Sequence, residues 1–83
     1  MKTEITRYKL YRIDTYYSIA DVEVTESTKA ALQGIVNALY ELVRINPNYE
    51  LHHYVNGKMF STTVGYYTQY HILSPNQEKN NEN

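Results

Sequence analysis

Three histidines are the side chains of this sequence best suited to site chemistry: His52, His53 and His71. Imidazole nitrogens bind zinc, and His52 and His53 are adjacent in a stretch that alternates like a β-strand. Neighbouring strand residues point to opposite faces of a sheet, so these two side chains cannot share one metal ion without distortion. We therefore expect no metal site, and we expect His53 to lie at the edge of the core with its hydrogen bonds satisfied.

Other catalytic patterns are missing from the sequence. It has no cysteine, no G-x-S-x-G motif and, with three glycines, no glycine-rich phosphate loop. Asp14, Asp21 and Glu23 could pair for acid-base work, but the spacing of Asp21 and Glu23 places them on the solvent face of a predicted strand. We therefore expect a protein that is not an enzyme and needs no cofactor.

A basic cluster near the N-terminus contains the candidate anion ligands Arg7, Lys9, Tyr11 and Arg12. Cations beside aromatic rings hold single-stranded nucleic acid on a sheet, and the same cluster could bind a small anion of the nucleotide type between the subunits of a dimer. It could also protect an edge strand from aggregation, so these alternatives stay open. The 8 basic and 9 acidic residues of the chain give no basic excess, which disfavours a dedicated duplex-DNA binder.

Tyrosine is the most unusual feature of the composition, with 10 tyrosines against one phenylalanine and no tryptophan. Exposed tyrosine is typical of recognition surfaces because it offers a large contact area at low rotamer entropy. A cross-strand tyrosine ladder within the protein is the alternative. Because Tyr67 and Tyr70 are an odd number of residues apart, we expect one of them in the core and the other at a partner. The candidate partner-binding residues are Tyr16, Tyr17, Tyr54, Tyr66, Tyr67 and Tyr70.

One amphipathic helix is predicted in the middle of the chain. Asn46-Pro47 ends it, and Thr25 or Ser27 is the expected N-cap. Its apolar residues recur at helical spacing and are expected to form one core-facing stripe: Leu32, Ile35, Val36, Leu39, Leu42 and Val43.

A β-hairpin follows the helix. Residues 49–55 and 58–64 alternate around Asn56-Gly57, the strongest two-residue hairpin signal. The turn predicts a register in which His53 faces Phe60 and Leu51 faces Thr62, with Val64 on the core face and Ser61 on the other. Gly65 is read as a bulge in one long bent strand in preference to a turn into a further strand.

Two further strands, residues 5–13 and 18–24, precede the helix. Together these elements predict an α+β domain over residues 1–73, with an antiparallel four-stranded sheet in ββαββ order packed on one helix. The polar tail, residues 74–83, is expected to be disordered. The first strand has apolar residues on both faces, which suggests that both are covered. A domain of this size also has a small core, and oligomerisation is a common way to stabilise it, so we expect a homodimer.

No segment of the sequence is long and apolar enough to span a membrane, and the N-terminus does not resemble a signal peptide, so we expect a cytoplasmic protein. Asn, Ile, Lys and Tyr are abundant, which suits an AT-rich genome. We expect a small non-enzymatic protein that docks its tyrosine-rich sheet surface on a protein partner. A phage or mobile-element accessory protein that inhibits a host enzyme or defence system fits this description.

Overall fold

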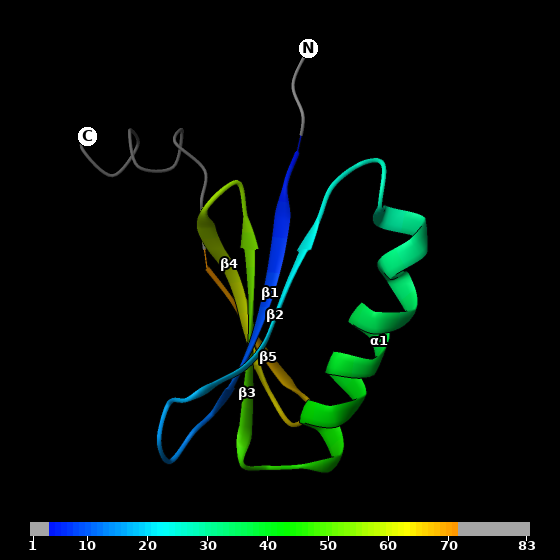
Figure 1. Cartoon of the computed structure of the whole chain (residues 1–83). Coiled ribbons are helices and arrows are strands. Elements are labelled where there is room, and N and C mark those ends of the chain that lie inside the picture. Colours follow the sequence, from blue (N-terminus) through cyan, green and yellow to red (C-terminus); the bar gives the residue numbers. More distant parts are fainter. Residues whose placement is uncertain (1–3, 72–83) are drawn as a thin grey trace, which may run out of the picture.

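Five strands and one helix make up the computed structural model, which describes residues 4–71 (Figure 1). The elements are β1 (Thr6–Arg12), β2 (Ser18–Val24), α1 (Lys29–Ile45), β3 (Tyr49–Val55), β4 (Lys58–Val64) and β5 (Tyr67–Tyr70). The strands form one antiparallel sheet in the order β2-β1-β3-β4-β5. The α+β class and the antiparallel sheet are confirmed. The sheet has five strands and not the expected four, so the ββαββ order is one strand short at its C-terminal end.

The fifth strand arises at Gly65, where the expected bulge is wrong. Val64 pairs with Tyr67, so Gly65 and Tyr66 form a two-residue turn between antiparallel strands. Gly65 has a φ of 62°, a left-handed conformation that glycine adopts without the steric penalty of a Cβ atom. The chain therefore reverses here instead of continuing along β4.

The β3–β4 hairpin turns at Asn56 and Gly57 as predicted, but its register is not the predicted one. The register shifts between His53 and Tyr54, so that Ser61 lies opposite His53 and Thr63 lies opposite Leu51. One extra residue on β4 reverses the faces of all that follow it. Consequently Ser61 is buried beneath the helix and Val64 lies on the other face, the reverse of the expectation for both.

The helix lies against one face of the sheet, which we call the helix face (Figure 1). The core forms there, where Leu10 and Leu51 of the sheet pack against Leu39 and Val43 of α1. No helix or strand of residues 4–71 covers the opposite surface, the open face. Because side chains alternate along a strand, the open face carries Arg7, Lys9, Tyr11, Glu50, His52 and Tyr54.

The helix buries a narrower stripe than the sequence predicts. Val36, Leu39 and Val43 are buried, but 47% of Ile35 and 39% of Leu42 remain exposed. The sheet therefore covers only part of the apolar side of α1, and the expectation of one core-facing stripe is wrong for Ile35 and Leu42.

The N-cap of α1 is Thr28, not Thr25 or Ser27. The Thr28 hydroxyl makes no cap hydrogen bond to the helix and instead accepts one from the backbone N–H of Thr25 at 3.0 Å. This bond closes the turn that leads from β2 into the helix.

The expected disordered tail, residues 74–83, and the domain boundary at residue 73 lie outside the described residues. Within residues 4–71, no helix is long and apolar enough to cross a membrane.

Candidate functional site

The most exposed tyrosines lie at the end of the sheet where α1 ends. Tyr66 is 84% exposed in the β4–β5 turn, Tyr67 follows it at 68%, and Tyr17 in the β1–β2 turn is 70% exposed. Both turns lie at the same end of the molecule as the loop from α1 to β3 (Figure 1). We call this surface the tyrosine end and define it by Ile13, Tyr17, Tyr66 and Tyr67.

Contacts to the rest of the fold hold the two turns of the tyrosine end. The backbone N–H of Ile13 donates to the carbonyl of Asn48 at 2.8 Å, which ties the β1–β2 turn to the loop after the helix. The Arg44 guanidinium lies over the Tyr66 ring, 5.8 Å from its centroid. The backbone of the β1–β2 turn and the ring of Tyr66 are therefore both in contact with the rest of the fold.

Tyr70 lies apart from the tyrosine end. Its ring meets Phe60 edge-on on the helix face, with centroids 5.6 Å apart, and it remains 66% exposed. Tyr67 and Tyr70 lie on opposite faces, as their odd separation requires. Neither is buried, so the expectation that one of them belongs to the core is wrong.

The remaining candidates, Tyr16 and Tyr54, lie on the open face around His52. The His52 ring centroid is 4.7 Å from that of Tyr11, 6.2 Å from that of Tyr16 and 6.1 Å from that of Tyr54. These three tyrosines leave only 6% of His52 exposed. The sequence pattern puts His52 on the face opposite His53, and it does not predict that Tyr11 and Tyr16 from another segment cover that face.

His52 also links two polar side chains of its own strand. Its Nε2 lies 2.7 Å from Oε2 of Glu50, and its Nδ1 lies 3.2 Å from the Tyr54 hydroxyl. The Tyr16 hydroxyl donates to the same oxygen of Glu50 at 3.3 Å. Carboxylate, imidazole and hydroxyl thus follow in the order of a catalytic triad.

The hydroxyl of this series is a neutral phenol. Burial raises the pKa of Tyr54, and the neighbouring Tyr11 raises it further. The phenol is therefore protonated at neutral pH. The hydrogen bonds of His52 to Glu50 and Tyr54 hold these three side chains together on the open face.

The candidate anion ligands are only partly brought together. Arg7, Lys9 and Tyr11 share the open face, whereas Arg12 lies at the far end of β1 and pairs with Asp14 at 2.8 Å. Arg7 is paired with both acidic residues of β2, at 2.8 Å from Asp21 and 3.3 Å from Glu23.

Lys9 lies over an aromatic ring, because its Nζ is 5.8 Å from the centroid of Tyr54. A cavity of about 540 Å³ beside it is lined by Ile5, Arg7, Lys9, Tyr54, Asn56 and Gly57. One ammonium and one ring are therefore available to a ligand, while the charge of Arg7 is already balanced.

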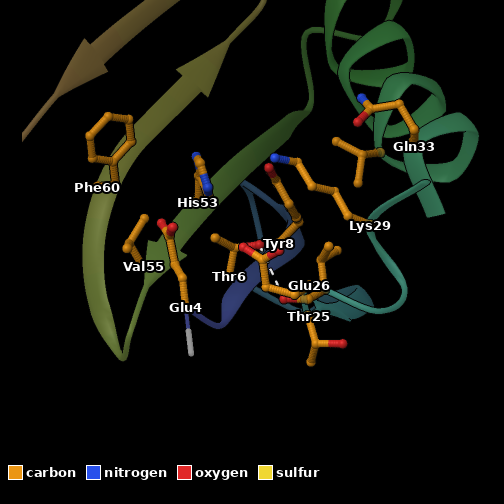
Figure 2. Close-up of a pocket in the computed structure, with 12 residues that line it drawn as sticks. Glu4, Thr6, Tyr8, Thr25, Glu26, Lys29, Gln33, His53, Val55 and Phe60 are labelled. Carbon is orange, nitrogen blue, oxygen red and sulfur yellow. Dashed lines mark hydrogen bonds between the residues drawn. The ribbon is translucent and has the colours of Figure 1, made fainter. Parts of the chain in front are cut away.

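A second cavity, of about 590 Å³, opens between the first turns of α1 and the helix face (Figure 2). His53 stacks on Tyr8 with ring centroids 4.3 Å apart and planes at 13°, and Phe60 meets His53 edge-on at 5.2 Å. Lys29 and Gln33 extend from the helix at the other side (Figure 2). This volume lies in the range of small-molecule pockets.

His53 is the unusual group of this cavity. Its Nε2 is buried and has no hydrogen-bond partner within residues 4–71, so the expectation of a satisfied histidine is wrong. Burial lowers the pKa of His53, which keeps the imidazole neutral near pH 7. Sequence reasoning missed this cavity because Tyr8 and His53 become neighbours only through the β1–β3 pairing.

Within the described part of the chain, no group of three or more His, Asp or Glu side chains is placed to hold a metal ion. Comparisons with protein-family models, with curated protein sequences and with solved structures return no match to this chain.

Proposed function

We propose that this protein is a non-enzymatic binding protein that docks on a protein partner through the tyrosine end. The observation that carries the proposal is the exposure of Tyr17, Tyr66 and Tyr67 on turns that contacts with the fold hold in place. Interface cores are enriched in tyrosine and depleted of charge, and a rigid aromatic ring loses little entropy on binding. Three of the four residues that define the tyrosine end are tyrosines, and none of the four is charged.

The electrostatics favour a protein over a nucleic acid as the partner. Binding to nucleic acid needs cations free to neutralise phosphates. Arg7 and Arg12 are each paired with a carboxylate at 2.8 Å, so their charges are balanced within the protein. A host enzyme or defence protein remains our predicted class of partner.

Affinity purification from cells of the native host tests this function, with the double variant Tyr66→Ala/Tyr67→Ala compared with wild type. Loss of two interface anchors should weaken partner binding by about 30-fold or more, equivalent to about 2 kcal/mol. Tyr70→Ala is the matched control, because Tyr70 is equally exposed but lies outside the tyrosine end. Circular dichroism should show that all three proteins are folded. Equal capture by the double variant and by wild type would exclude the tyrosine end as the docking surface.

A second candidate function is the binding of a small anion of the nucleotide type in the cavity beside Lys9 and Tyr54. The position of Lys9 over the Tyr54 ring favours it, because a cation and an aromatic ring together suit a phosphate joined to a base. Calorimetric titration with nucleoside monophosphates should then show binding to wild type and none to Lys9→Gln. No heat of binding to wild type would exclude this candidate.

A further inference from the structure

The helix carries a second apolar seam that the sheet does not cover. The residues on it are four, three, four and three positions apart, and all are exposed: Ala31, Ile35, Ala38, Leu42 and Ile45. The larger side chains are exposed by 47% at Ile35, 39% at Leu42 and 73% at Ile45. We call this surface the outer seam. It lies beside the row formed by Leu32, Val36, Leu39 and Val43, which packs on the sheet.

The outer seam contains no charged residue. The polar residues of the helix lie on its other flank, where Gln33 donates to Asn37 at 3.1 Å and Arg44 pairs with Glu41. Alternating spacings of four and three are the pattern of a helix that packs along another helix. Residues 4–71 contain one helix, so nothing within them packs along the outer seam as a second helix would.

We propose that the outer seam binds the outer seam of a second copy of this chain, with the two helices antiparallel about a two-fold axis at Ala38. In this arrangement Ala38 meets the Ala38 of the second copy, and Ala31 lies opposite Ile45. Ile35 of each copy packs beside Leu42 of the other. The small Ala38 pair lets the two helices approach closely at the axis, and Ile35 and Leu42 pack on either side of it, so one surface is complementary to itself, as a closed two-fold interface requires.

Charge also favours a second copy. Pairing two outer seams buries no ionised side chain, so it avoids the desolvation cost of a buried charge. The antiparallel arrangement places the positive end of each helix dipole beside the negative end of the other. A partner with a charged helix would gain no ion pair from this uncharged surface.

The contact area indicates a weak dimer. A helix of 17 residues is about 25 Å long. One helix flank of that length is smaller than the roughly 800 Å² per partner of a standard interface. We therefore expect a dissociation constant in the micromolar range. The outer seam shares no residue with the tyrosine end, so dimerisation and partner docking can fail independently.

Analytical ultracentrifugation between about 5 and about 500 µM tests the proposal, since this range brackets a micromolar equilibrium. The average mass of wild type should rise from the 9.8 kDa of the chain toward twice that value. Ala38→Glu places two like charges at the two-fold axis and should raise the dissociation constant at least tenfold. Asn37→Glu is the matched control, because it adds the same charge to the adjacent exposed residue on the polar flank. It should behave like wild type.

Disulfide cross-linking supplies an independent readout because the natural chain contains no cysteine. In the proposed dimer a cysteine at the axis lies opposite its own copy, and a disulfide forms across a Cα separation of about 4.4–6.8 Å. Ala38→Cys should therefore form a covalent dimer under mild oxidation at least ten times faster than Asn37→Cys. The proposal is wrong if wild type stays a monomer throughout the concentration range. It is equally wrong if the two cysteine variants cross-link at the same rate. That result is also expected if the outer seam binds only a different protein.

Discussion

The imidazole of His52 lies between Glu50 and Tyr54, with Nε2 2.7 Å from the carboxylate and Nδ1 3.2 Å from the hydroxyl. It is buried although no helix covers that face of the sheet, because Tyr11 and Tyr16 cover it instead. The open face therefore has a small aromatic cluster of its own.

The first prediction concerns this cluster. Replacing His52 with alanine leaves a space under three tyrosine rings and removes one of the two hydrogen-bond partners of Glu50. His52→Ala should therefore lower the free energy of unfolding by about 2–4 kcal/mol. Urea denaturation measures this loss of stability. Gln69→Ala, at an exposed position of β5, should change the stability by less than about 0.5 kcal/mol. If the two variants unfold at the same urea concentration, His52 has no structural role.

A second prediction separates the two apolar rows of α1. Leu39 is 6% exposed in the core, whereas Leu42 on the same helix is 39% exposed. Leu39→Ala should cost about 2–4 kcal/mol, and Leu42→Ala less than about 1 kcal/mol, because only the first leaves a cavity. Both variants should be unfolded by urea at low protein concentration, where the monomer dominates. Equal losses would show that the helix meets the sheet with a different flank.

The third prediction concerns pH and follows from the lowered pKa of His53. Above the ordinary histidine pKa of 6.5 the side chain is neutral in both the folded and the unfolded state, so it adds no pH dependence. Below 6.5 the unfolded chain takes up a proton that the folded protein resists. The free energy of unfolding should therefore decrease as the pH falls below 6.5 and level off below the pKa of the folded state.

The variant His53→Phe tests this assignment, since phenylalanine retains an aromatic ring beside Tyr8 without a titratable group. The difference in stability between wild type and His53→Phe should be constant above pH 6.5 and should shift in favour of the variant below it. NMR titration of the His53 ring reports its pKa directly. A value at or above 6.5 would contradict the role of burial.

Local sequence patterns were sufficient for the elements whose signals lie within a few neighbouring residues. The helical spacing of Val36, Leu39 and Val43 predicted the helix and its buried row, and Asn56-Gly57 predicted the hairpin turn. Arg7, Lys9 and Tyr11 alternate along β1, and this spacing by itself indicates that they share a face. In each case the geometry follows from the backbone period and from turn conformations, which depend on adjacent residues alone.

The tertiary structure decided what depends on residues far apart in the chain. Gly65 has the conformation of a turn because β5 has β4 to pair with, and the register shift on β4 buries Ser61 in place of Val64. Likewise, His52 is buried because the β1–β2 turn brings Tyr16 to it across 36 positions of the sequence. No periodicity within one segment contains this information.

The width of the helix surface that meets the sheet was also decided only in the folded protein. The sequence determined that six apolar positions lie along one side of α1, but not that the sheet would bury the row containing Leu39 and leave Ile35 and Leu42 exposed. The apolar pattern is a property of the helix alone. Burial is a property of the helix and its neighbours together, because it depends on where the sheet ends and on which surfaces come within van der Waals contact.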